Sequence, residues 1–376
     1  MSTRFRVGVY GTGRGTYLAR LFARHDDVQI AAGCDFDPAR LASFASSFPD
    51  ARLFRNYADL LAVDLDILVL ASYIHDHGPD AVKALQAGKD VFSAITAFHT
   101  PAEGVALVEA VEKSGRQYMM DENHCYAREI LEMRRLFREG ILGNFLYGEC
   151  EYVHDIRNMM GRNADGSYHW RAWLPPFYYN THSLGPVLEI ADARPVSVIG
   201  QAVESRIAGC RSPIDFGVSL VRLSSGALVR VLLSFSAVRE PYSVWYNLYG
   251  TQGAVESDRW EGGVVHVYRE GDLLVECKHR YVPRFPVCAE EAARAGHGGG
   301  DFYTVHLFLE ALRNGTPLPI DVYQACDFTL PGILAYRSWV EGGRCLEVPD
   351  LRDPAVRERY RNDHFRCPQG EAVREG

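Results

Sequence analysis

The sequence predicts two domains: an α/β domain with a doubly wound parallel sheet, followed by an α+β domain with an open, mainly antiparallel sheet. The chain has 376 residues, which is too long for one ordinary hydrophobic core. In its first third, continuous apolar segments alternate with amphipathic ones, as in a parallel sheet covered by helices on both faces. After Gly148, alternating segments are separated by Gly, Ser and Pro turns, which is typical of antiparallel strands.

The first domain is assigned to residues 1–122. Its strand segments are short and apolar, and each is followed by a segment with helical periodicity. The expected strands are 5–11, 28–35, 65–72, 90–94 and 116–122, and the expected helices are 17–25, 38–48, 79–88 and 102–115.

The second domain is assigned to residues 123–365, and 366–376 to a flexible charged tail. Two late helices, 301–315 and 327–343, are expected to pack back on the body. One face of the open sheet needs cover, so we expect a homodimer or homotetramer formed sheet to sheet. The expected strands are 196–203, 216–224, 227–238, 243–250, 253–258 and 263–270.

Composition excludes several classes of function. A net charge of −8 without a Lys/Arg-rich run argues against nucleic acid as a partner. No apolar run is long enough to cross a membrane, and the start "MSTRFRVGVYGTG" has no signal-peptide pattern. The nine scattered cysteines never form a C-x-x-C pair, which favours reduced thiols in a cytoplasmic protein and no metal site.

The stretch "VGVYGTGRGT" ends the first strand and opens the first helix, as a dinucleotide-binding turn does. Gly11 would make the tight turn and Gly13 would admit the pyrophosphate; either Gly15 or Thr16 would fill the third position. Asp35 follows about 20 residues on, where a carboxylate binds ribose hydroxyls and disfavours the phosphate of NADP. The prediction is a Rossmann domain that binds NAD. Expected cofactor contacts are Gly11, Thr12, Gly13, Arg14, Gly15, Thr16, Asp35, Ser72, His75, His77, Glu122 and Asn123.

Four polar clusters stand near predicted strand ends or helix starts, and together they suggest a site: "ASYIHDHG", "DENHCYARE", "EYVHDIRN" and "YHWRAWLPPFYYNTHSLGPVLEIADA". Each also has a simpler explanation. His75 and His77 could be loop residues or, less favoured, zinc ligands. "EYVHDIR" could be a salt-bridged sheet face. Tyr179 and His182 could form part of a helix start that Asn180 or Thr181 caps.

The chain resembles the Gfo/Idh/MocA family of sugar oxidoreductases. The motifs "ENHCYAR", "YVHDIR", "HWR", "YNTHSLGPV", "HGGGD" and "DVYQACDF…EVPDL" are similar to those of its NAD-dependent glycoside hydrolases, typified by α-N-acetylgalactosaminidase. The family's usual Glu-Lys-Pro motif after the fifth strand is replaced by Ala94-Ile95-Thr96, and Tyr178 replaces the usual aspartate before the site histidine.

The resemblance implies a sugar site and an NAD-recycling mechanism: oxidation at C3, loss of the C2 hydrogen, elimination of the aglycone, addition of water and re-reduction. It suggests that Tyr126, Arg171, Tyr179 and His182 line the site, with His297 nearby. We expect His182 to take the C3 hydroxyl proton with help from Tyr179, and Tyr126 to deprotonate C2 if Arg171 or Arg157 lowers its pKa. The expected substrate contacts are Arg171, His154, Arg157 and His297.

Two other functions remain compatible with the sequence. One is a simple NAD-dependent dehydrogenase of a sugar, cyclitol or glycoside. The other is a catalytically silent sugar or nucleotide sensor, which the missing lysine at Ala94-Ile95-Thr96 makes conceivable.

Overall fold

The structure is a computed structural model, and it describes residues 5–163, 166–272 and 279–368. The chain forms two compact units, described separately here. The first contains the described residues up to Asp121 together with 301–326 and 351–364. The second contains 122–300, 327–350 and the described residues from Phe365.

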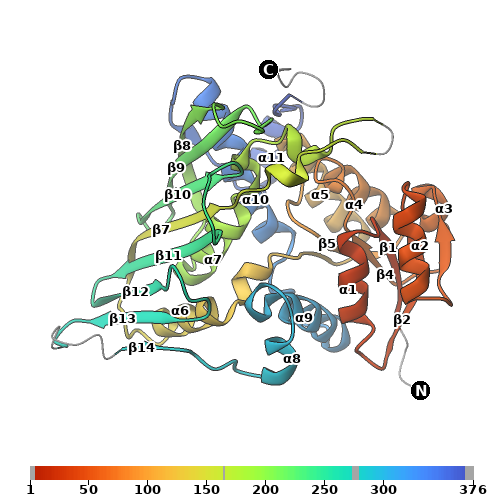
Figure 1. The fold of residues 1–376 in the computed structure, drawn as a ribbon, viewed down its shortest axis with the longest axis horizontal. Coiled ribbons are helices and arrows are strands. Elements are labelled where there is room, and N and C mark those ends of the chain that lie inside the picture. Colours follow the sequence, from red (N-terminus) through yellow and green to blue (C-terminus); the bar gives the residue numbers. More distant parts are fainter. Residues whose placement is uncertain (1–4, 164–165, 273–278, 369–376) are drawn as a thin grey trace. The chain divides into compact units, whose positions relative to one another are not determined.

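The first unit is built on a parallel sheet with the strand order β3-β2-β1-β4-β5-β6, six strands within the described residues (Figure 1). Its central strands are almost fully buried, which explains why they are continuously apolar in sequence. The doubly wound fold predicted from the sequence is confirmed. The strands are β1 (Phe5–Tyr10), β2 (Val28–Cys34), β3 (Arg52–Phe54), β4 (Ile67–Leu70), β5 (Asp90–Ser93) and β6 (Tyr118–Met120).

Helices follow each of the first five strands, and side-chain caps fix several of their starts. Asp37, Asn56 and Thr100 each accept a hydrogen bond from a backbone N–H of the first turn of their helix. The helices are α1 (Arg14–Phe22), α2 (Pro38–Ser47), α3 (Tyr57–Leu61), α4 (His77–Gln86) and α5 (Pro101–Ser114).

Two segments from the C-terminal part of the chain complete the first unit. The ring of Phe308, on α9 (Gly300–Asn314), lies 5.3 Å from that of Phe92 on β5. Arg357, on α11 (Pro354–Tyr360), donates to Glu112 of α5 at 2.7 Å. These segments were expected in the second domain, but burial of their apolar and charged faces against β5 and α5 places them in the first.

The second unit contains a mixed, mostly antiparallel sheet with the order β14-β13-β12-β11-β7-β10-β9-β8-β15, nine strands within the described residues. β7 and β10 are parallel to each other, which the sequence did not indicate. The strands are β7 (Phe145–Val153), β8 (Pro195–Glu204), β9 (Ile214–Leu223), β10 (Leu228–Ser234), β11 (Ser243–Gly250), β12 (Gly253–Ser257), β13 (Val265–Arg269), β14 (Arg280–Tyr281) and β15 (Leu346–Glu347).

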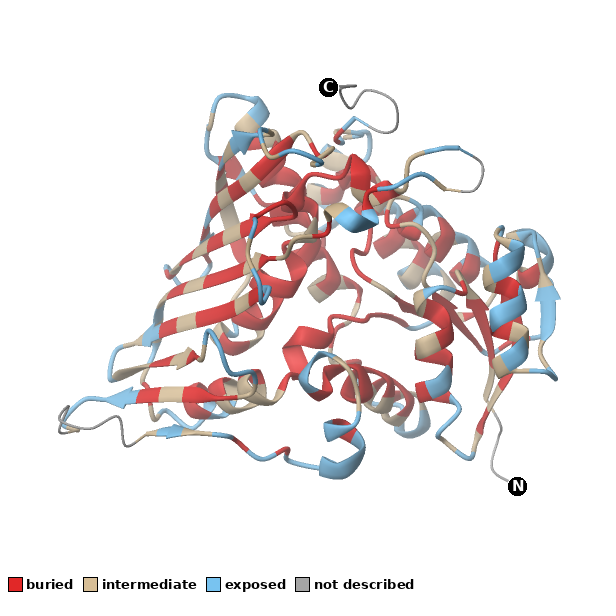
Figure 2. Cartoon of the chain, in the orientation of Figure 1, coloured by how far each residue is buried: buried red, intermediate tan, exposed pale blue. Residues whose placement is uncertain are grey.

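One face of this sheet is covered by α7 (Thr181–Ala191) and by the part of α10 (Val322–Val340) that belongs to the second unit. Gly148 of β7 lies against Val187 of α7, and Gly200 of β8 lies against the backbone of Ala335. Residues of the opposite face are partly exposed, so buried and exposed positions alternate along the strands (Figure 2). α6 (Arg128–Arg138) and α8 (Ala289–Ala293) also belong to this unit.

The first residues of the predicted flexible tail pack against the second unit. Cys367 is fully buried, and its backbone N–H donates to the Tyr178 hydroxyl at 2.9 Å. The rest of the predicted tail, 369–376, lies outside the described residues, as does Cys277. The eight described cysteines are all free thiols.

Candidate functional site: a nucleotide turn and a histidine–tyrosine cluster

The turn between β1 and α1 has the geometry of a dinucleotide-binding turn. Gly11 has φ +87°, and a Cβ there would lie 2.2 Å from the Ala71 carbonyl oxygen, so only glycine fits. A Cβ at Gly15 would lie 2.6 Å from Val9 Cγ1, so Gly15 is the residue that lets helix and strand pack closely. Thr16 instead donates its hydroxyl to the carbonyl of Thr12.

The backbone at Gly13 is open to a ligand. A Cβ there would meet nothing nearer than the Arg40 guanidinium at 3.6 Å, and no side chain caps the N-terminus of α1. Free backbone N–H groups at a helix start suit a pyrophosphate. The residues present therefore fit a dinucleotide.

Asp35 follows β2 and lies beside this turn. Its carboxylate accepts hydrogen bonds from the backbone N–H of Thr12 at 2.7 Å and from the Thr12 hydroxyl at 3.0 Å. Arg14 was expected to contact the cofactor, but its guanidinium forms an ion pair with Asp301 and lies 3.5 Å from Asp121.

The loop after β4 holds the other expected cofactor residues of the first unit. Both ring nitrogens of the buried His77 face backbone carbonyls, those of Thr96 at 2.8 Å and Ser72 at 3.1 Å. Burial lowers the pKa of His77. His77 therefore acts by holding this loop together rather than by offering a free nitrogen. His75 lies 3.4 Å from Asp76 and is only partly buried.

In the second unit, aromatic and acidic side chains gather around His182 at the start of α7. We call Glu122, His124, Tyr152, His154, Tyr179, His182 and His297 the histidine–tyrosine cluster. The His182 ring lies 4.4 Å from that of His124, 5.0 Å from Tyr179 and 5.4 Å from Tyr152, measured between centroids. His182 and Tyr179 thus come together as predicted, although no side chain of Asn180 caps the helix.

Glu122 holds His182 in place. Its carboxylate lies 2.7 Å from Nδ1 of His182, and both residues are buried. Burial raises the pKa of Glu122 to about 7, although His124 and Thr181 partly offset the effect. From the sequence, Glu122 was expected to contact the cofactor; in the structure its carboxylate pairs with His182 in the histidine–tyrosine cluster. When Glu122 is ionised, it accepts the Nδ1–H of His182. Nε2 of His182 is then left as a proton acceptor.

Tyr152 and His154 form a second proton-handling pair. The Tyr152 hydroxyl lies 3.1 Å from Nδ1 of His154. Burial raises the pKa of Tyr152 well above 10.0 and lowers the pKa of His154, so the phenol is a donor and the imidazole is neutral. Tyr152 was not predicted. It lies near the end of β7, and His154 follows that strand by one residue, with its backbone N–H donating to the Ser234 carbonyl at 3.0 Å.

The predicted substrate residues Arg171 and Arg157 differ in their surroundings. Arg171 lies 4.1 Å above the Trp170 ring, whose centroid is 6.2 Å from that of Tyr179, so it is near the cluster. Arg157 forms an ion pair with Asp155 at 2.6 Å and donates to the Ala208 carbonyl at 2.8 Å. The salt-bridge interpretation of this motif therefore holds for Arg157.

Tyr126, which we expected to deprotonate C2, lies beside Arg134 in the second unit. Its side chain is buried, with the Arg134 guanidinium 5.5 Å from the ring. Burial raises its pKa well above 10.0, as it does for Tyr152, so the two phenols differ in their neighbours and not in the direction of their pKa shifts. Sequence spacing could not distinguish this tyrosine from Tyr152.

The "HGGGD" motif brings His297 to the cluster. The His297 ring lies 5.6 Å from that of His124, and its φ of +51° is uncommon for a residue with a side chain. A Cβ at Gly300 would lie 1.9 Å from the carbonyl oxygen of Asn123, so this glycine is needed where the two segments meet. Asn123 thus contributes its backbone to the cluster's frame.

Two features are absent from the residues that the structure describes, a metal-binding group and a membrane-spanning helix. No three His, Cys, Asp or Glu side chains among them are grouped so that they could hold a metal ion. None of their helices is both long and apolar enough to cross a membrane.

Comparisons with known proteins agree with these features. Residues 5–122 match the family model "Oxidoreductase family, NAD-binding Rossmann fold" of Gfo/Idh/MocA proteins. Residues 215–356 match "Glycosyl hydrolase 109, C-terminal domain". The first domain thus matches the NAD-binding domain of Gfo/Idh/MocA oxidoreductases, and the second matches the C-terminal domain of glycosyl hydrolase 109 proteins.

Individual relatives support the assignment. The chain is 28% identical over 341 residues to an α-N-acetylgalactosaminidase of Tannerella forsythia, covering 77% of this chain and 71% of the relative. It is 29% identical over 396 residues to a glycosyl hydrolase family 109 protein of Shewanella amazonensis, covering 92% and 85%.

Solved structures share the fold. Levoglucosan dehydrogenase in complex with NADH matches with a TM-score of 0.80 at 16% identity, covering 93% of this chain and all of that one. The WlbA dehydrogenase of Bordetella pertussis, in complex with NADH and UDP-GlcNAcA, matches with a TM-score of 0.77 at 18% identity. The match covers 93% of this chain and 99% of that one.

Proposed function

We propose that the protein cleaves a glycoside by transient oxidation of its sugar, with NAD recycled in each turnover. The observation that carries this proposal is the presence of two separate proton-handling pairs in the histidine–tyrosine cluster, Glu122–His182 and Tyr152–His154. Ordinary glycosidases use two carboxylates at the scissile bond. The Glu122 carboxylate is committed to His182, which fits a mechanism based on proton abstraction instead.

His182 is proposed to take the proton of the C3 hydroxyl. With Glu122 ionised and accepting from Nδ1–H, Nε2 carries a lone pair and can act as a general base. The C3–H bond breaks as a hydride leaves, and the carbon becomes a ketone. Tyr179, whose ring lies 5.0 Å from that of His182, is placed to orient the sugar.

Tyr152 and His154 are proposed to handle the proton on C2. The new ketone acidifies the C2–H bond. As that proton passes to the Tyr152 oxygen, the phenol proton can pass to the neutral His154 Nδ1, so no phenolate has to exist beforehand. The C1–aglycone bond then breaks as C1 and C2 become doubly bonded, and the aglycone oxygen takes up a proton, so that the aglycone leaves as an alcohol or phenol. Water adds to C1 and a proton returns to C2, which restores the sugar skeleton.

The first unit is proposed to hold NAD through the Gly11–Gly15 turn, with Asp35 at the adenosine ribose. When bound, NAD supplies the hydride acceptor and later the donor for C3. The Asp35 carboxylate would repel a ribose phosphate, which favours NAD over NADP.

The test is product analysis in deuterated water without added cofactor, using aryl α- and β-glycosides that include an α-N-acetylgalactosaminide. We expect free sugar with one deuterium at C2 and no net change of cofactor redox state. A keto-sugar product formed together with stoichiometric cofactor reduction would refute the glycosidase proposal and identify a simple dehydrogenase, whose first step needs only His182 and Glu122. Absence of both reactions would point to a sensor.

We also propose that the protein forms a homodimer or homotetramer through the open face of the second-unit sheet. Cross-strand register places Tyr147, Tyr249, Ala254 and Tyr268 in one row on the face opposite α7. Tyr249 is 43% and Tyr268 41% exposed, which leaves aromatic surface for a second copy to cover. Sedimentation analysis of the wild type and of Tyr249→Glu tests this.

The proposed location is the cytoplasm. Free thiols at eight described cysteines suit a reducing compartment. Cell fractionation followed by detection of the native protein tests this.

A further inference from the structure

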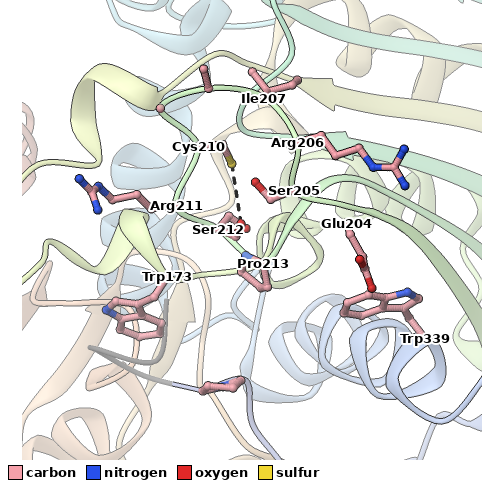
Figure 3. Close-up of a pocket in the computed structure, with 13 residues that line it drawn as sticks. Trp173, Glu204, Ser205, Arg206, Ile207, Cys210, Arg211, Ser212, Pro213 and Trp339 are labelled. Atoms are coloured by element: carbon pink, nitrogen blue, oxygen red, sulfur yellow. Dashed lines mark hydrogen bonds between the residues drawn. The ribbon is translucent and has the colours of Figure 1, made fainter. Parts of the chain in front are cut away.

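The second unit contains a cavity that is separate from the histidine–tyrosine cluster. Its volume is about 420 Å³, within the range of small-molecule sites. It is lined by the connection between β8 and β9, by Trp173 and by Trp339 of α10 (Figure 3). Among the described residues that line it, none belongs to the cluster.

A buried hydroxyl group in the wall of this cavity lacks a partner. Ser212 is only 1% exposed, and its Oγ has no hydrogen-bond partner among the described residues. Buried polar groups are normally hydrogen-bonded, so this unpaired hydroxyl is a candidate partner for a water molecule or for a ligand group. A hydroxyl or carbonyl of a ligand could satisfy it.

The chemistry of the walls suits a sugar. Figure 3 shows the indoles of Trp173 and Trp339 on either side of Pro213. Aromatic faces pack well against the C–H face of a pyranose ring. Charged groups of both signs also line the cavity, those of Arg206, Arg211 and Glu204. Donors and acceptors together match the hydroxyl groups of a neutral saccharide better than a simple anion, which would need donors alone.

The loop that forms the cavity is held in shape without a ligand. The buried Asp215 carboxylate accepts from the backbone N–H of Arg206 at 2.5 Å and of Ile207 at 2.9 Å. Arg211 donates to the Tyr168 hydroxyl at 2.9 Å, and Arg157 donates to the Ala208 carbonyl at 2.8 Å. Such preorganisation lowers the entropic cost of binding.

We propose that this cavity is a second saccharide site, which binds a neutral pyranose residue other than the one processed at the cluster. This inference rests on the proposed function, since it takes the substrate to be a glycan. Trp173 follows Trp170 by three residues, so their Cα atoms are at most about 11 Å apart. The Trp170 ring lies 6.2 Å from that of Tyr179. Neighbouring units of one glycan can therefore reach both places.

The test is fluorine NMR of the full-length protein labelled with 5-fluorotryptophan. The five tryptophans give five signals, assigned by single Trp→Phe variants. The probes are lactose, N-acetylgalactosamine, N-acetylneuraminic acid and inorganic phosphate. We expect a neutral saccharide to shift the Trp339 signal saturably. The signal of Trp260, which is 71% exposed and outside the cavity, serves as the internal control and stays in place. Ser212→Ala should weaken the binding several-fold.

Three outcomes would overturn the inference or separate it from the proposed function. No shift of Trp339 with any saccharide up to about 10 mM contradicts it. A shift with phosphate or N-acetylneuraminic acid alone indicates an anion site instead.

A kinetic experiment tests the same site. Trp339→Ala should raise KM about tenfold for an oligosaccharide and leave KM for a monosaccharide aryl glycoside unchanged, with Trp260→Ala as the matched control. If the wild type cleaves no glycoside, the proposed function fails, but the NMR titration still decides the second site.

Discussion

Replacing Glu122 by Gln should lower the turnover of the protein and, at high pH, raise its free energy of unfolding. A glutamine can donate its N–H to Nδ1 of His182, at the position where the carboxylate now lies 2.7 Å away. The histidine would then carry its proton on Nε2 and could not accept one from the sugar. The loss of a correctly oriented imidazole tautomer costs on the order of 10³–10⁴-fold in turnover.

The same substitution should stabilise the fold at high pH. The pKa of Glu122 rises from 4.5 to about 7, so the folded protein binds this proton more tightly than the unfolded chain does. Ionisation therefore costs nothing below pH 4.5 and its full amount above about pH 7. The interval of about 2.5 pH units, at 1.36 kcal/mol each, corresponds to roughly 3 kcal/mol. Glu122→Gln removes this cost, so its free energy of unfolding should exceed that of the wild type by up to this amount above pH 7.

The assay combines turnover and urea unfolding between about pH 5 and about pH 9. Wild-type turnover should rise with pH through about 7, as the Glu122–His182 pair ionises. Glu189→Gln is the matched control, because Glu189 of α7 is also a largely buried carboxylate but is paired with Arg134 at 3.1 Å. The control should keep near-normal turnover per folded molecule. Wild-type turnover in Glu122→Gln, or a stability gain that is the same at pH 5 and pH 9, would refute this reasoning.

Three further substitutions test other parts of the structure. Tyr152→Phe keeps the ring contacts but loses the hydroxyl beside His154. The exchange of deuterium into C2 should therefore fall about 10²–10³-fold, while oxidation at C3 persists. An unchanged rate of exchange would exclude proton transfer through Tyr152 and His154. Gly11→Ala should lower the thermal unfolding temperature more than Gly226→Ala does. Both glycines have a positive φ, but only at Gly11 would a Cβ meet the backbone, 2.2 Å from the Ala71 carbonyl oxygen. Equal losses of stability in the two variants would contradict this close contact. Asp35→Asn should weaken NAD binding about tenfold and reduce the ratio of NAD affinity to NADP affinity, both measured by fluorescence titration. An unchanged ratio would show that Asp35 does not bind the adenosine ribose.

Local signals predicted most of the first unit up to Asp121. Apolar strands, amphipathic helices and the glycine turn each depend on neighbours close in sequence, so the parallel sheet and the NAD-binding turn followed from pattern, whereas the short elements β3 and α3 were not predicted. The contribution of α9 and α11 could not be predicted, since it depends on contacts such as Arg357 with Glu112 across 245 residues.

The site was predicted in part for the same reason. His182 and Tyr179 were recognised because helix starts and motif spacing are local features. The partnership of Glu122 with His182 spans 60 residues and has no local signature. Tyr126 was assigned to the C2 proton and Tyr152 was not considered, because the distance of a phenol from the imidazoles depends on tertiary packing, which cannot be read from the neighbours of a tyrosine in sequence.

The placement of α11 affects how the chain folds during synthesis. The backbone N–H of Ala102 on α5 donates to the carbonyl of Asp363 at 2.9 Å, and Arg357 holds Glu112 of the same helix. A ribosome therefore has to synthesise the chain beyond Asp363 before the nucleotide-binding unit can close these contacts. Although this unit begins with β1, a truncation that removed α11 would damage it.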